Sequence, residues 1–78
     1  MTKADKRDLK IRNNPNNVKF QDFVAWLEYN GFVLDRISSS HHIFVHPDID
    51  TPINAQKKKD GKAKAYQVRQ AIKLIDGE

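Results

Sequence analysis

Large apolar residues recur at helical spacing in two parts of the chain. Between residues 19 and 30 they occupy positions i, i+3, i+4 and i+7, at Phe20, Phe23, Val24 and Leu27. Between residues 65 and 75 the same periodicity is met by Ala65, Val68, Ala71, Ile72 and Ile75. Gly31 and Gly77 then stand where a residue in the left-handed conformation commonly ends a helix. The pattern predicts two amphipathic helices, each with one face directed toward a core.

Three short runs between these helices are typical of strands. Residues 32–37 and 42–46 are rich in β-branched and aromatic side chains, and the serines between them favour a hairpin. Residues 51–55 form a third candidate strand after a turn at 47–50, and Pro52 requires either that this strand lies at a sheet edge or that the proline is its first residue. The order predicts an α+β fold of the form α-β-β-β-α. Both helices would cover one face of a three-stranded antiparallel sheet, and the other face would be open.

The first sixteen residues lack such a pattern. They are mostly polar, offer only Leu9 and Ile11 for burial, and end in a turn-forming stretch of asparagines around Pro15. We predict a flexible basic arm over residues 1–16, with one helical turn, and a single domain over residues 17–78. A chain of 78 residues supports only one hydrophobic core.

The positive charges are clustered. The formal net charge is +4, and residues 57–64 include five lysines and one aspartate. Such a cluster suits a polyanion, because each neutralised phosphate releases counterions, but it also suits a solvated loop. Both interpretations stay open for Lys57, Lys58, Lys59, Lys62 and Lys64.

The composition favours a cytoplasmic protein. The chain contains no cysteine, as is common in a reducing compartment, and this excludes disulfides and thiolate metal sites. No run approaches the roughly 20 apolar residues that a membrane span requires, and the N-terminus is charged with no apolar run behind it. We therefore expect a soluble, unsecreted domain with no membrane partner.

The segment 38–42 is the densest cluster of reactive side chains, with three serines followed by His41 and His42. Imidazole suits proton transfer at neutral pH, so one interpretation is a histidine that activates a ribose hydroxyl. A metal site is a second, although His42 and His46 would lie about 13 Å apart along a strand. A third is that the histidines merely occupy a strand edge. A serine nucleophile lacks a nearby carboxylate and the usual glycine-flanked elbow.

The alternation of side chains along the second strand bears on the choice between the two histidines. If Ile43 and Val45 face the helices, the open face holds His42, Phe44 and His46, and His41 lies on the inner face. This parity favours His42, unless a bulge at the start of the strand re-aims His41.

Two aromatic residues have alternative roles. Trp26 lies off the apolar stripe of the first helix, where it either joins the core or meets a partner. Tyr66, at the start of the last helix, suits either base stacking or core packing.

Three motifs together resemble those of one family. They are Trp26-Leu27-Glu28-Tyr29-Asn30-Gly31-Phe32, then Ser39-Ser40-His41-His42-Ile43-Phe44-Val45-His46-Pro47, and Tyr66-Gln67-Val68-Arg69-Gln70. Residues 17–75 are similar to the HicA toxins of bacterial and archaeal toxin–antitoxin pairs. The resemblance implies a double-stranded-RNA-binding-like fold, metal-independent mRNA cleavage that halts translation, no cofactor, and neutralisation by a HicB-type antitoxin.

The family motif places its serine on Ser40 and its catalytic histidine on His41 or His42. Ser39 stands where the family usually has glycine, which removes a residue that adopts positive φ freely. Many members also have a histidine after the third strand, where this chain has Asn54-Ala55-Gln56. We expect a slow endoribonuclease in which Ser39 and Ser40 contact phosphate and the five lysines of residues 57–64 hold the RNA backbone.

Two other functions stay open. A non-catalytic RNA-binding module would keep the fold and the basic loop, and loss of turnover would explain Ser39. A protein-interaction domain would use the open face of the sheet, with Phe44 and Trp26. Cleavage activity separates the first from a nuclease, and salt-sensitive RNA binding counts against the second.

Overall fold

Three strands lie between helices along the chain. In the computed structural model, which describes residues 2–77, the order is α1 (Lys3–Asn13), α2 (Phe20–Tyr29), β1 (Val33–Ser38), β2 (His41–His46), β3 (Ile49–Gln56) and α3 (Ala65–Ile75). The strands form one antiparallel sheet in the order β1-β2-β3. The predicted α+β class is therefore confirmed. Within residues 2–77, no helix has the length and apolar character needed to cross a membrane.

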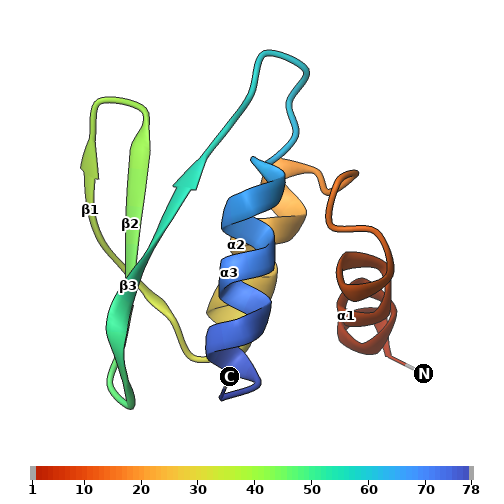
Figure 1. The fold of residues 1–78 in the computed structure, drawn as a ribbon, viewed down its shortest axis with the longest axis horizontal. Coiled ribbons are helices and arrows are strands. Elements are labelled where there is room, and N and C mark those ends of the chain that lie inside the picture. Colours follow the sequence, from red (N-terminus) through yellow and green to blue (C-terminus); the bar gives the residue numbers. More distant parts are fainter. Residues whose placement is uncertain (1, 78) are drawn as a thin grey trace.

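The elements form layers. Helices α2 and α3 cover one face of the sheet, as predicted, and α1 packs against α2 on the side away from the sheet (Figure 1). The core lies between the sheet and the α2/α3 layer. Burial of one large apolar side chain contributes roughly 1.5–3 kcal/mol. The buried apolar residues are Ile11, Val18, Phe23, Trp26, Leu27, Phe32, Phe44, Ile53, Ala55, Ala63, Val68 and Ala71.

Helix α1 occupies most of the segment where we expected an arm. It has 11 residues, where one turn was predicted. The backbone N–H of Asp5 donates to the Thr2 hydroxyl at 3.1 Å, and the backbone N–H of Thr2 donates to the Asp5 carboxylate at 3.2 Å. This reciprocal capping box satisfies two otherwise free donors, and Ile11 is buried in the core. Hydrophobic periodicity did not reveal the helix because Ile11 is its one fully buried side chain among the described residues.

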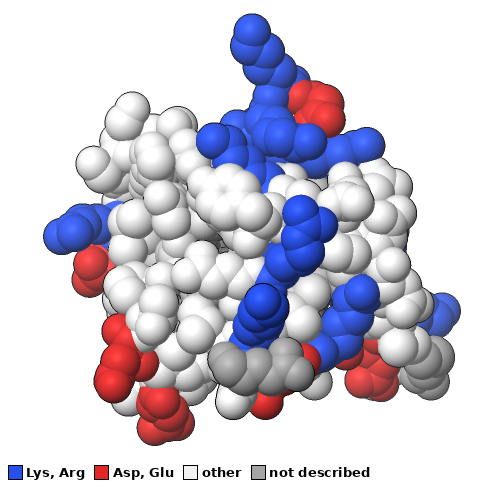
Figure 2. All heavy atoms as spheres, viewed as in Figure 1, with Lys and Arg blue, Asp and Glu red and all other residues white. Residues whose placement is uncertain are grey.

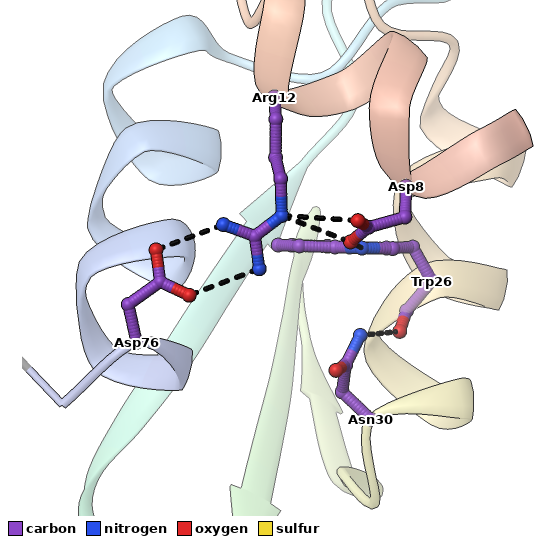
Figure 3. A network of polar contacts seen from close by, with 5 residues as sticks. All are labelled: Asp8, Arg12, Trp26, Asn30 and Asp76. Atoms are coloured by element: carbon purple, nitrogen blue, oxygen red, sulfur yellow. Dashed lines mark hydrogen bonds and ion pairs between the residues drawn. The ribbon is translucent and has the colours of Figure 1, made fainter. Parts of the chain in front are cut away.

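Polar side chains join the three helices (Figure 3). Arg12 Nε donates to Asp8 at 3.0 Å, and its two terminal nitrogens donate to the two carboxylate oxygens of Asp76 at 2.8 and 2.9 Å. The indole Nε1 of Trp26 donates to Asp8 Oδ1 at 2.9 Å. Hydrogen bonds to Asp76 and Asp8 raise the pKa of Arg12 above its ordinary value. Trp26, for which two roles were open, is buried in the core and tied to α1.

The predicted facing of β2 is wrong. Phe44 is 1% exposed, whereas Val45 is 38% exposed. The reason is that Phe44 has the larger apolar surface, so its burial stabilises the fold more. By alternation, His42 also points toward the helices, and His41 lies on the open face. The pairing of β1 with β2 is regular at this end, so no bulge re-aims either histidine.

Candidate functional site at the His41 end of the sheet

A two-residue turn connects β1 to β2 within the serine cluster. Ser38 pairs with His41, so Ser39 and Ser40 form the connection, and all three serines are exposed. Ser39 has a φ of 57°, and among residues 2–77 it is the one non-glycine residue with positive φ. Two-residue hairpin turns favour glycine at such positions. Ser39 therefore adopts a conformation that suits the glycine expected from the HicA resemblance.

His41 lies on the open face and is held by two amides from β3. Its Nδ1 is 2.7 Å from Asn54 Nδ2, and its Nε2 is 3.2 Å from Gln56 Nε2. The pairing of β2 with β3 accounts for these contacts, because His41 lies opposite Gln56, and Asn54 is two residues further along the same face. The ring is half-buried, so these contacts fix its orientation and leave part of it accessible.

Helix α3 supports the site through a buried glutamine. Gln67 is 1% exposed. Its Oε1 accepts a hydrogen bond from the Gln56 backbone N–H at 2.8 Å, and its Nε2 donates to Gln56 Oε1 at 3.0 Å. Two bonds between the same pair of residues fix the Gln56 side chain relative to α3. Gln56, Gln67 and Asn54 were not identified from the sequence as site residues. The register between strands and the packing of α3 decide which of these side chains meet.

His42 occupies a different environment from His41. Its ring meets the Phe20 ring edge-on, with centroids 5.1 Å apart, and its Nδ1 is buried without a hydrogen-bond partner in the structure. The structure therefore does not bring the two candidate histidines together: one lies on the open face and the other packs beneath α2.

The third histidine, His46, makes contacts that hold neighbouring segments together. The His46 Nδ1 accepts a hydrogen bond from the Asp48 backbone N–H at 3.0 Å, so its Nε2 carries the proton and donates to the Asn30 carbonyl at 3.0 Å. The ring also meets Phe32 edge-on at 5.0 Å. His46 thus ties the end of β2 to the segment after α2, and does not share the open face with His41.

The lysine loop, residues 57–64, is a tight hydrogen-bonded turn. Lys57 pairs with Ala63, the Lys58 backbone N–H donates to the Lys62 carbonyl at 2.8 Å, and the Gly61 N–H donates to the Lys58 carbonyl at 3.0 Å. These hydrogen bonds order the backbone of the segment, and the side chains of Lys57, Lys58 and Lys59 are exposed. A solvated loop and a phosphate-binding cluster both fit this geometry.

The loop lies beside the start of α2. Lys19 pairs with Lys62, and the Phe20 backbone N–H donates to the Gly61 carbonyl at 3.0 Å. Asp60 lies among these cations: the Lys62 backbone N–H donates to its carboxylate at 3.0 Å, and this bond, with the nearby lysines, lowers the pKa of Asp60. A shallow pocket at this end is lined by Lys19, Phe20, Gln21, Lys57, Asp60 and Gly61.

Basic side chains gather at one end of the molecule. Figure 2 shows a cluster of lysine and arginine side chains at the end that holds the β3–α3 loop, with one acidic side chain among them, while the rest of this face carries basic and acidic side chains side by side. Since Lys57 directly follows Gln56, the lysine loop begins one residue beyond the partner of His41. Within residues 2–77, the structure shows no group of three His, Cys, Asp or Glu residues arranged to hold a metal ion.

The comparison with protein families gives one match. The family described as HicA toxin of bacterial toxin–antitoxin systems matches residues 20–76, a range that includes α2, the three strands, the lysine loop and α3. No curated protein and no solved structure matched, so the double-stranded-RNA-binding-like description of the fold stays a prediction. The match covers well over half of the chain and contains the site described above except for Lys19. The chain therefore belongs to the HicA family, as the toxin of a toxin–antitoxin pair whose partner is an antitoxin.

Proposed function

We propose that this toxin is an endoribonuclease that cleaves mRNA in the cytoplasm and so blocks translation, with His41 as its acid–base group. The main support is the position of His41 on the open face, opposite Gln56, from which β3 continues into the lysine loop. A group suited to proton transfer and a surface suited to phosphate thus share one end of the molecule. His42 is the second candidate for the acid–base group, because its ring packs against Phe20.

RNA supplies the nucleophile in the proposed reaction. A ribose 2′-oxygen forms a bond to the adjacent phosphorus, and the bond from phosphorus to the 5′-oxygen of the next nucleotide breaks. His41 takes the proton of the 2′-hydroxyl, and the leaving 5′-oxygen takes a proton from water. Ser39 and Ser40 donate hydrogen bonds to the phosphate, and the lysine loop offsets its charge. Positioned acid–base catalysis contributes about 10² to 10⁴ in rate, so one histidine implies a slow enzyme.

The proposed binding partners are RNA and an antitoxin protein. The RNA backbone contacts Lys57, Lys58, Lys59, Lys62 and Lys64 of the lysine loop. The antitoxin is of the HicB type, as the family resemblance implies. The reaction as proposed uses no metal ion and no small-molecule cofactor.

A non-catalytic RNA-binding module is the second candidate, and one observation favours it. Ser39 has a φ of 57°, and a side chain here blocks the close approach of RNA to the backbone that a glycine would allow. Such a protein would bind RNA through the same loop and leave it intact.

The deciding experiment combines growth with RNA integrity. Wild type, His41→Ala and His42→Ala are expressed from an inducible promoter, intact mRNA is followed, and each purified protein is tested on synthetic RNA with and without a chelator. Circular dichroism confirms that each variant is folded. We expect wild type and His42→Ala to arrest growth and cleave RNA in the presence of chelator, and His41→Ala to do neither.

Two other outcomes would change the proposal. Loss of cleavage in folded His42→Ala alone would transfer the acid–base role to His42. If wild type binds RNA in a salt-sensitive manner but leaves it intact, the ribonuclease proposal is abandoned for the binding module.

A further inference from the structure

The neighbours of His41 decide which of its ring nitrogens carries the proton. Two amide nitrogens approach the ring: Asn54 Nδ2 lies 2.7 Å from Nδ1, and Gln56 Nε2 lies 3.2 Å from Nε2. A neutral imidazole has one N–H and one lone pair, so it cannot accept hydrogen bonds at both nitrogens. One of the two amides must therefore present its oxygen to the ring.

Gln67 determines the orientation of Gln56. Because the Gln56 backbone N–H donates to Gln67 Oε1 at 2.8 Å, the nitrogen of the Gln67 amide is left to donate. It donates to Gln56 Oε1 at 3.0 Å and to the Tyr66 hydroxyl at 3.2 Å. Gln67 is buried, so water does not compete for these bonds. Gln56 thus presents its Nε2 to His41, and the ring Nε2 accepts.

Asn54 is then the amide that presents its oxygen. With its nitrogen toward His41, its Oδ1 is buried and has no hydrogen-bond partner in the structure. A half-turn of the amide exchanges oxygen and nitrogen and brings Oδ1 to the ring Nδ1, where 2.7 Å is a hydrogen-bonding distance. The rotation pairs the oxygen with the ring N–H and moves Nδ2 to the buried position that Oδ1 occupied, so the tautomer is decided by the orientation of Gln56 that Gln67 sets.

We propose that Asn54 is a positioning residue that holds His41 as the Nδ1–H tautomer, with Nε2 as the nitrogen that accepts the substrate proton. The proposal rests on the ribonuclease function proposed above. In the RNA-free protein Gln56 occupies Nε2 through the longer of the two contacts, and the substrate 2′-hydroxyl replaces it. An asparagine that orients a histidine through its second nitrogen serves cysteine proteases in the same way.

The tautomer is measured directly by long-range ¹H–¹⁵N correlation spectra of the RNA-free wild-type protein, at a pH where the ring is neutral. His41→Ala identifies the His41 signals. We expect protonation at Nδ1. Protonation at Nε2 in the wild type would overturn the proposal, and this result does not depend on whether the protein cleaves RNA.

Two variants of Asn54 test the positioning role. Asn54→Ala removes the acceptor, so the Nδ1–H preference should be lost and kcat should fall about tenfold or more, with KM for RNA changed less than about twofold. Asn54→Asp retains an acceptor of the same shape and should keep the tautomer and most of kcat. An Asn54→Ala spectrum identical to that of the wild type contradicts the proposal.

The failure of the proposed function would look different from the failure of the positioning role. If wild type leaves RNA intact while the spectra show the Nδ1–H tautomer and its loss in Asn54→Ala, the positioning by Asn54 stands and the ribonuclease function falls. If wild type cleaves RNA through His41 but the tautomer is Nε2–H, the function stands and the positioning role falls.

Discussion

The indole Nε1 of Trp26 donates a 2.9 Å hydrogen bond to Asp8 Oδ1, which joins the buried face of α2 to a helix that the sequence pattern did not predict. The family match begins at residue 20, so α1 lies outside the matched range. The bond nevertheless satisfies a donor on one of the largest buried side chains of the core.

This bond predicts a measurable difference between two substitutions of Asp8. Asp8→Ala leaves the indole N–H unpaired and should lower the free energy of unfolding by about 1–3 kcal/mol. Asp8→Asn keeps an oxygen acceptor and should lower it by less. Urea unfolding followed by the fluorescence of Trp26, the single tryptophan of the chain, measures both. Equal losses for the two variants would show that the acceptor is unimportant.

The ion pair between Arg12 and Asp76 makes stability depend on pH. The hydrogen bond from Arg12 lowers the pKa of Asp76 below its usual 3.8, so the unfolded state binds the proton more readily. The stabilisation is therefore present above the unfolded pKa and is lost as pH falls through the folded pKa. Asp76→Asn should lose stability at neutral pH and show a smaller further loss at about pH 3 than the wild type. The matched control, Asp50→Asn at an exposed carboxylate, should retain the wild-type pH dependence.

The turn at Ser39 predicts a stabilising substitution. A left-handed conformation costs a non-glycine residue roughly 1–2 kcal/mol. Part of this gain is lost in a glycine variant, because glycine loses more conformational entropy on folding. Ser39→Gly should therefore raise the free energy of unfolding by up to about 1 kcal/mol. The φ of Ser40 is not positive, so Ser40→Gly should lower stability. Chemical denaturation measures both, and a destabilised Ser39→Gly would contradict the account of this turn.

Position 31 requires glycine for two reasons, its backbone conformation and the closeness of the His46 ring. Its φ is +94°, and a Cβ here would lie 2.8 Å from His46 Nε2, the atom that donates to the Asn30 carbonyl. Gly31→Ala should lower the free energy of unfolding by more than the roughly 1–2 kcal/mol of the conformational cost alone. Gly61→Ala provides the control, since φ there is +85° but no atom lies within 4 Å of the added Cβ. Thermal unfolding should rank the two, and equal losses would exclude a role for His46.

The lysine loop predicts the salt dependence of RNA binding. Each phosphate contact with a single strand contributes about 0.7 to the slope of log affinity against log salt. Replacing Lys57, Lys58 and Lys59 with glutamine should therefore reduce that slope by about 2. The same change at Lys3, Lys6 and Lys10, which are exposed on α1, alters net charge equally and should affect the slope much less. Equal effects of both triple variants would mean that binding depends only on overall charge.

The sequence alone determined the elements from residue 20 onward. Periodicity placed two helices within a residue or two of α2 and α3 and predicted all three strands, because an amphipathic face and a run of β-branched residues are local properties. The motif around His41 likewise indicated the family that the comparison shows. The lysine cluster was evident in the sequence for the same reason.

Tertiary structure decided what depends on contacts between distant segments. Helix α1 forms because Thr2 caps it and Ile11 finds a core supplied by other helices, neither of which hydrophobic periodicity records. The facing of β2 follows from the burial of Phe44, and a strand that is apolar on both faces does not reveal its inner side. The environment of His41 depends on strand register and on Gln67 of α3. The sequence thus named the candidate histidines, and only packing determined which of them lies on the open face and what holds it there.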